Sequence, residues 1–188
     1  MFNTTTKSSK QIKLDELLPL VTRTDERGDI KYANYYFKEI TGYTDLELIG
    51  HPHNIIRHPD MPKVIFTLMW QRLKDDQDIL TILKNRTKDG NYFWVTTSFR
   101  TTYSEVTKHK NGYMAVTHAA PKQAIQEVES LYEKLLEIEK REGEVGSIKY
   151  LLDFFEANDT NYDEYLKDIT TKHGFLDSMF HKNRVYLK

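Results

Sequence analysis

The sequence predicts an α+β fold, in which a five-stranded antiparallel sheet carries short helices over one face and further helices follow it. Five segments have the alternation, or the β-branched and aromatic content, expected of strands. Two of them open the chain as a hairpin, and three come together after a run of short helical segments. The predicted strands are residues 20–25, 30–33, 79–87, 92–103 and 113–119.

Turn residues separate these strands where hairpins need them. Glu26-Arg27-Gly28-Asp29 follows the first strand, and Lys88-Asp89-Gly90-Asn91 carries the Asp-Gly pair typical of a tight hairpin turn. Between the two hairpins, Asn34 is placed to cap a helix that ends at Gly42, and a further short helix closes at Gly50.

Two prolines mark the starts of longer helices. Pro62 opens an amphipathic helix that runs to Leu73, and Asp60 is its expected cap. After Pro121, residues 123–142 contain no glycine or proline and place an apolar stripe along one side of a helix. This stripe must be buried, either against its own domain or against the same helix of a second chain.

The breaks in this pattern divide the chain into four parts. Gly143 and Gly146 interrupt the long helix, and two more helices are predicted over residues 148–157 and 162–181. The four parts are a loose N-terminal arm at residues 1–14, a sheet domain at 15–120, a connecting helix at 121–143 and a C-terminal helical extension at 144–188.

Composition excludes several classes of function. The chain has 188 residues, and its formal net charge of −1 gives no general attraction for nucleic acid or an anionic membrane. It contains no cysteine, which rules out disulfides, thiolate metal sites and cysteine nucleophiles. The N-terminus has no apolar signal segment, and no apolar run reaches the ~20 residues of a membrane span. We therefore expect a cytoplasmic protein that neither binds nucleic acid nor inserts directly into a membrane.

The segment His51–Lys63, with the sequence HPHNIIRHPDMPK, is the richest in functional groups. Imidazoles, an amide, a guanidinium and a carboxylate in one loop suit a ligand with phosphates, hydroxyls and a heteroaromatic ring. The alternative is a loop held by its own hydrogen bonds, with Arg57 paired to Asp60. Its three histidines reach one ion only if the loop folds tightly, so we expect no metal site.

Other features favour structure over chemistry. Trp70 and Trp94 either stack on a ligand ring or belong to the core, and the core is favoured because tryptophan buries a large area. No phosphate-binding glycine loop, zinc-protease motif, nucleophile elbow or acid–base pair is present in the sequence, so we do not expect an enzyme.

Several short motifs together resemble a PAS domain. They are Thr24-Asp25-Glu26-Arg27-Gly28, Tyr32-Ala33-Asn34, Ile40-Thr41-Gly42-Tyr43-Thr44 and Leu48-Ile49-Gly50. The His51–Lys63 loop narrows the resemblance to the PAS domain of bacterial aerotaxis and energy-taxis receptors, over roughly residues 15–140. Further matches are Met69-Trp70, Lys84-Asn85-Arg86, Lys88-Asp89-Gly90, Trp94-Val95 and Gly112-Tyr113-Met114.

The resemblance implies a PAS fold and a non-covalently bound FAD whose redox state reports respiratory electron flow to the chemotaxis machinery. It carries over six cofactor-binding residues, which are Asn34, His53, Arg57, His58, Asp60 and Trp70. In this family-based assignment Arg57 faces anionic or carbonyl oxygens, His58 and Asp60 fix the loop, and Trp70 lines the ring pocket. Asn34 either bonds the edge of the ring or only caps its helix.

The sequence departs from this family at two positions. Flavin-binding receptors have a tryptophan and then a small residue on the strand before Lys-Asn-Arg, and here Ile79 and Thr81 stand in those places. A ligand-free PAS dimerisation module and a haem-based gas sensor stay open as alternatives. We expect a redox or energy sensor that works as a homodimer in a bipartite system, beside a membrane-bound methyl-accepting-type transducer or another signalling protein.

Overall fold

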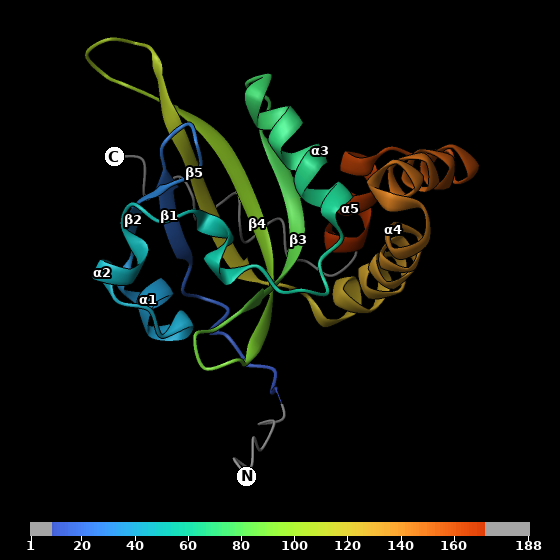
Figure 1. Cartoon of the computed structure of the whole chain (residues 1–188), viewed down its shortest axis with the longest axis horizontal. Helices are drawn as coiled ribbons and strands as arrows, with labels where there is room; N and C mark the ends of the chain where they lie inside the picture. The colour runs from blue at the N-terminus through green and yellow to red at the C-terminus, as the bar shows by residue number, and fades with distance from the viewer. Residues whose placement is uncertain (1–8, 172–188) are drawn as a thin grey trace. The chain divides into compact units, whose positions relative to one another are not determined.

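The computed structural model describes residues 9–171, and its sheet has five strands in the order β2-β1-β5-β4-β3 (Figure 1). The first hairpin and the later three-stranded meander meet where β1 pairs antiparallel with β5. This arrangement confirms the predicted α+β fold. The strands are β1 (Leu20–Thr24), β2 (Ile30–Ala33), β3 (Ile79–Arg86), β4 (Tyr92–Tyr103) and β5 (Lys110–Ala119).

The helices begin and end close to the predicted capping and breaking residues. They are α1 (Tyr35–Thr41), α2 (Asp45–Leu48), the 3₁₀ helix η1 (His53–Ile56), α3 (Lys63–Lys74), α4 (Lys122–Ala157) and α5 (Tyr162–Thr171). Two details differ from the prediction, since the polar loop contains η1 and α4 continues beyond a non-helical residue at Gly143. The start of the predicted arm and the end of the last predicted helix lie outside the described residues.

The chain divides into two compact units. The first comprises Met1–His58 and Leu83–Ala119, and the second comprises Pro59–Ile82 and Ala120–Lys188. Four strands, α1, α2 and η1 therefore belong to the first unit together with the end of β3, whereas α3, α4, α5 and the start of β3 belong to the second. The domain boundaries expected from sequence stay predictions.

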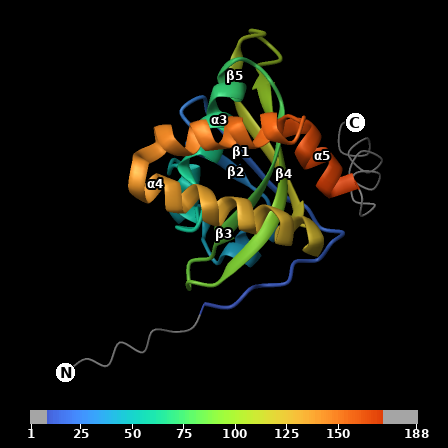
Figure 2. The same cartoon turned by 90° about the vertical axis from the view of Figure 1, so that its right-hand side faces the viewer.

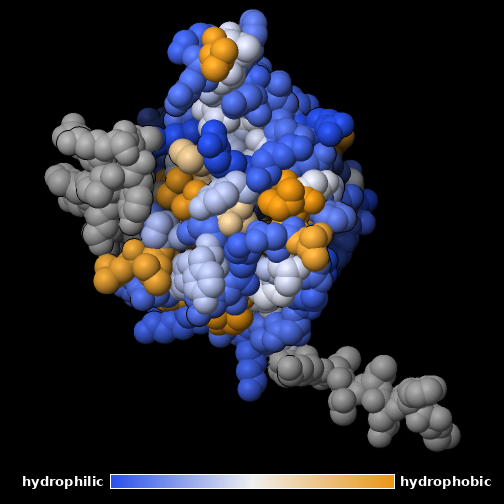
Figure 3. Space-filling model, turned by 90° about the vertical axis from the view of Figure 1, so that its left-hand side faces the viewer, coloured by the Kyte–Doolittle hydropathy of each residue, from blue (hydrophilic) through white to orange (hydrophobic). Residues whose placement is uncertain are grey.

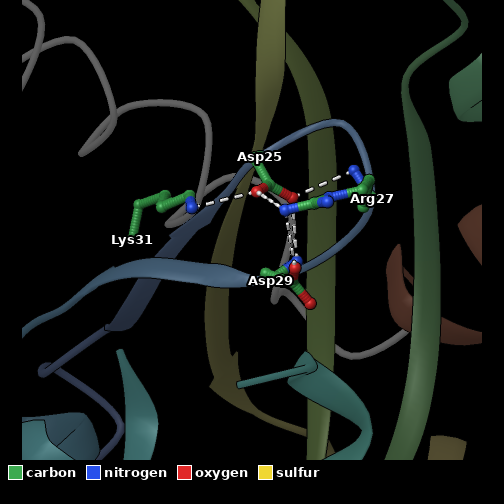
Figure 4. A network of polar contacts seen from close by, with 4 residues as sticks. All are labelled: Asp25, Arg27, Asp29 and Lys31. Atoms are coloured by element: carbon green, nitrogen blue, oxygen red, sulfur yellow. Dashed lines mark hydrogen bonds and ion pairs between the residues drawn. The ribbon is translucent and has the colours of Figure 1, made fainter. Parts of the chain in front are cut away.

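A polar network around Asp25 fixes the β1–β2 hairpin of the first unit (Figure 4). One oxygen of Asp25 accepts the backbone N–H groups of Arg27 and Asp29, each at 3.0 Å. Its other oxygen lies 3.0 Å from the ammonium group of Lys31 and 3.7 Å from the Arg27 guanidinium. The network closes the turn that the sequence predicts, because a carboxylate satisfies backbone donors that a two-stranded hairpin leaves unpaired.

Strands β1 and β5 approach each other unusually closely at Gly112. This glycine has a φ of 143°, and a Cβ atom built on it would lie 1.9 Å from the backbone oxygen of Thr24. Only glycine fits there, because any side chain would collide with the neighbouring main chain.

Hydrophobic side chains that reach the surface of the first unit do so in small groups. Figure 3 shows orange residues separated by blue and white ones on the side where α1 and α2 lie. Leu46 in α2 and Ile49 at its C-cap are exposed, with exposed fractions of 93% and 43%. Scattered exposed side chains of this kind are normal for soluble domains.

The second unit contains a helix that reverses direction. Figure 2 shows the two halves of α4 running in opposite directions, and the reversal lies at Gly143, which has a φ of 71° and a ψ of −173°. The predicted apolar stripe, including Val128, Leu135 and Ile138, is buried within the chain itself. Of the two alternatives for burying it, the structure therefore shows the first.

The N-terminus of α3 is capped from a distant part of the sequence. The backbone N–H groups of Lys63 and Val64 each donate to the carboxylate of Glu139 at 3.0 Å, and the hydroxyl of Ser147 donates to the same carboxylate at 3.1 Å. The expected cap at Asp60 was therefore wrong. The helix begins one residue later than predicted, and a carboxylate 76 residues away satisfies its first amide groups.

Candidate functional site

One side of the sheet in the first unit carries several threonine hydroxyl groups. The Cα partners Thr22 and Ala115, and then Ala115 and Phe99, lie opposite each other on neighbouring strands and so share a face. The hydroxyls of Thr97 and Thr117 hydrogen-bond each other on this same face at 3.0 Å. We call it the threonine face, and its residues are Thr22, Thr97, Phe99, Ala115 and Thr117.

His53, the first residue of η1, lies against the threonine face. Its Nε2 atom and the hydroxyl of Thr22 share a hydrogen bond of 2.9 Å, and its ring centroid lies 6.1 Å from that of Phe37. Protein atoms surround the ring, although the residue keeps some exposed surface. This burial lowers the pKa of His53 to about 4, so the imidazole is neutral near pH 7. A neutral ring offers one donor and one acceptor.

Arg57 is placed on the same face by its pairing with β3. Arg57 and Asn85 form an antiparallel bridge, so their side chains point to one side of the sheet. The ammonium group of Lys84 lies 4.7 Å from the ring centroid of Tyr92, on the opposite face. Neighbouring residues of a strand alternate, so Asn85 and Arg57 lie on the threonine face. Asn85 is buried there, with 7% of its surface exposed.

His58 lies on the other side of the sheet from Arg57. Its backbone N–H donates to the carbonyl of Lys84 at 3.4 Å, and its ring meets that of Tyr92 edge-on with centroids 5.8 Å apart. These contacts join the end of the polar loop to β3. They place the His58 ring on the opposite side of the sheet from His53 and Arg57, and the assignment of His58 to a binding site stays a prediction.

Asn34 acts as the cap of α1. Its side-chain oxygen accepts the backbone N–H groups of Phe37 at 3.0 Å and Val21 at 3.1 Å, while its amide nitrogen donates to the carbonyl of Pro19 at 2.9 Å. Of the two roles expected for Asn34, the structure shows capping. Through this cap it also positions Phe37, which contacts the ring of His53.

Asp60 and Trp70 belong to the second unit. Asp60 is exposed in the segment before α3, and Trp70 is half-buried on that helix, one turn after the half-buried Phe66. Their assignment to a binding site stays a prediction of the resemblance.

Sequence reasoning missed the threonines and Asn85. It placed residues 79–87 in a strand but assigned no role to Asn85, which the structure buries together with Thr87. Side chains along a strand alternate between the two faces of the sheet, and this alternation could have placed Thr22 and Thr97 on the inward face.

The described part of the chain contains neither a candidate metal cluster nor a helix that could span a membrane. Among residues 9–171, no group of three or more histidine, cysteine, aspartate or glutamate side chains could hold a metal ion. Every helix described there is too short or too polar to cross a membrane.

Comparisons with known proteins identify the domain. Residues 30–116 match the family model described as the PAS fold. Over 117 residues the chain is 41% identical to the aerotaxis receptor of Escherichia coli (strain K12), which covers 62% of this chain and 22% of the receptor. The chain contains a PAS domain of the aerotaxis receptor family.

The PAS domain also resembles other proteins. It is 29% identical over 107 residues to the bacterioopsin transcriptional activator of Halobacterium salinarum, covering 54% of this chain and 16% of the activator. A light-oxygen-voltage domain, solved in work on a flavin analogue, matches 62% of this chain and 86% of its own with a TM-score of 0.51 and 20% identity, which supports the fold. The chain thus spans less than a quarter of either curated relative. These relatives are sensory and regulatory proteins, and no catalytic family is indicated.

Proposed function

We propose that the PAS domain senses redox or energy state through non-covalently bound FAD, and that it relays this state to a signalling partner. The observation that carries the proposal is that a neutral imidazole, a guanidinium and a buried amide, from His53, Arg57 and Asn85, all lie on one face of the sheet. When bound, FAD supplies a flat ring whose charge and hydrogen bonding change on reduction.

The groups on the threonine face suit such a ligand. Uncharged donors and acceptors, from the imidazole of His53 and the amide of Asn85, match the carbonyl and N–H groups at the edge of a heteroaromatic ring. The guanidinium of Arg57 offers several N–H donors for carbonyl or phosphate oxygens. Ala115, a small residue on the same face, suits a flat ring, which needs small side chains on one wall.

The proposed output follows from the match to the aerotaxis receptor. We propose a homodimer that acts on a chemotaxis-type transducer. For redox state to be transmitted, the oxidised and reduced ligand must interact differently with two arrangements of the protein.

Absorbance of the freshly purified protein tests the proposal. We expect a yellow protein that releases fluorescent flavin on heating, and colourless protein that stays free of ligand after incubation with excess FAD would contradict it. Arg57→Ala should weaken FAD binding at least about tenfold without unfolding the domain, since a charge-assisted hydrogen bond contributes about 1.5–3 kcal/mol. The matched control is Arg23→Ala, because Arg23 is an exposed arginine on the opposite face of β1 from Thr22.

A ligand-free interaction module is the second candidate. It is favoured by the hydrogen bonds that Thr97 and Thr117, and Thr22 and His53, make with each other. In that case Arg57→Ala leaves both self-association and the absence of colour unchanged, whereas a red protein would indicate a haem sensor.

A further inference from the structure

Strand β3 is at the edge of the sheet, with β4 as its one neighbour in the strand order. Its other edge accepts hydrogen bonds from outside the sheet. The carbonyl of Lys84 accepts the backbone N–H of His58, and Arg57 bridges to Asn85 beside it. The end of the polar loop that carries the candidate ligand residues is therefore attached directly to this strand.

The same edge is bound again two residues earlier. Carbonyls of residues i and i+2 in a strand point to the same side, so Ile82 and Lys84 present theirs to one edge. The hydroxyl of Tyr132, on α4, donates to the carbonyl of Ile82 at 2.8 Å. A side-chain hydroxyl here takes the place that a strand N–H would otherwise fill.

A second phenol binds the neighbouring residue. The hydroxyl of Tyr162, on α5, donates to the hydroxyl of Thr81 at 2.7 Å. Thr81 is fully buried, and both tyrosines are buried, with 3% of Tyr132 and 5% of Tyr162 exposed. Thr81 is one of the two positions at which this sequence departs from flavin-binding receptors, and its hydroxyl has a specific use in the second unit.

Both phenols act as permanent donors. Burial raises the pKa of Tyr132 and of Tyr162 well above the usual range, so neither loses its proton near pH 7. A buried hydrogen bond to an obligate backbone acceptor is costly to break, because the carbonyl is then left unsatisfied.

We propose that strand β3 couples the polar loop to the C-terminal helices, and that Tyr132 and Tyr162 are the residues through which α4 and α5 follow the strand. The contacts stand independently of any ligand, but the signal they would carry rests on the proposed flavin function. A displacement imposed on Lys84 and Asn85 by the loop reaches Thr81 and Ile82 because the residues are consecutive in one extended segment.

The coupling is tested first in flavin-free protein, by hydrogen exchange of backbone amides. In Tyr132→Phe and Tyr162→Phe the ring stays and only the hydroxyl is lost. We expect the His58 amide, which donates to Lys84, to exchange about tenfold faster in at least one variant. Tyr165→Phe is the matched control on α5, because the Tyr165 ring packs against Phe154 and Phe155 with centroids 5.6 and 6.0 Å away.

Unchanged His58 exchange in both variants would overturn the coupling, whether or not the protein binds flavin. If Tyr162→Phe fails to fold by circular dichroism, Thr81→Val replaces it, since this change removes the acceptor of the Tyr162 hydroxyl and keeps the shape. If Tyr132→Phe fails to fold, the result for Tyr162→Phe decides.

A second arm uses FAD-loaded protein before and after reduction with dithionite. We expect reduction to change the exchange of the α5 amides in the natural protein, and to change them at least about fivefold less in Tyr132→Phe. Equal responses in the two proteins would overturn the coupling. Failure to load FAD at all would instead contradict the proposed function, while the flavin-free arm would still decide the role of β3.

Discussion

The threonine face of the first unit and the phenol contacts of the second both bury hydroxyl groups, and they use them differently. Thr97 and Thr117 bond each other, side chain to side chain, whereas Tyr132 bonds the main chain at Ile82. A ligand group can replace one partner of a side-chain pair without breaking the sheet. The loss of a phenol leaves a buried carbonyl without its donor. The Thr97–Thr117 contact is therefore exchangeable, whereas the contact of Tyr132 with the main chain is fixed.

This contrast predicts which substitutions affect ligand binding and which affect stability. Changes on the threonine face should alter ligand binding more than stability, and changes in the second unit should do the opposite. Substitutions that distort the backbone of the first unit are an exception. They should lower both stability and ligand binding, because the strands that carry the threonine face are then displaced.

The largest effect is expected for Gly112→Ala. The added methyl group meets the Thr24 backbone oxygen, and φ at this residue suits glycine. Overpacking and backbone strain together should lower the free energy of unfolding by about 4 kcal/mol, measured by urea denaturation. Gly90→Ala is the control, because its φ of 88° is similarly unfavourable but nothing lies within 4 Å of its Cβ position. Equal losses in both variants would show that close approach of β1 and β5 is unimportant.

In the second unit, Leu135→Ala should cost about 3 kcal/mol of unfolding free energy. Leu135 is fully buried in the apolar stripe of α4, so the change removes buried methyl groups and leaves a cavity. Leu152→Ala, on the same helix but 65% exposed, should cost less than about 0.5 kcal/mol. Denaturation followed by circular dichroism measures both. FAD affinity of Leu135→Ala under folding conditions should match that of the natural protein, which keeps packing and binding separate.

The third prediction concerns acid. His53 has a pKa of about 4 in the folded protein, below its ordinary value of 6.5, so the unfolded chain takes up a proton first as pH falls. Its contribution to stability is complete above pH 6.5 and is lost as pH decreases toward 4. This loss should reach on the order of 2 kcal/mol at pH 4.5. In His53→Gln, the unfolding free energy should fall by that much less between neutral pH and pH 4.5. An unchanged slope would mean that the pKa of His53 is the same in the folded and unfolded protein.

The fold was readable from sequence because its determinants are local. The Asp-Gly turn at Lys88–Asn91, the Asn34 cap and the break at Gly143 each act within a few residues, and each lies where the structure has a boundary. The resemblance to the PAS domain assigned a binding role to residues of the polar loop. Which side of the sheet each loop residue faces was not readable, because it depends on the pairing of Arg57 with Asn85, 28 residues later. The alternation of side chains along each strand could have placed Thr22 and Thr97 on the inward face, but it was not applied to them.

The cap of α3 also depends on a contact between residues far apart in the sequence, which local rules cannot predict. Its removal is expected to have the smallest effect on the free energy of unfolding. Asp60 is a residue type that often caps helices and lies just before the start of α3, yet Glu139 accepts both leading amide groups, from Lys63 and Val64. Glu139→Gln keeps the shape but removes the charge and one acceptor, so unfolding free energy should fall by about 1 kcal/mol. Glu137→Gln is the control on α4, where an exposed ion pair with Lys134 contributes little. Faster exchange of the Val64 amide in Glu139→Gln alone would assign the cap to tertiary contact. Equal exchange of the Val64 amide in both variants would show that residues near the start of α3, and not Glu139, cap the helix.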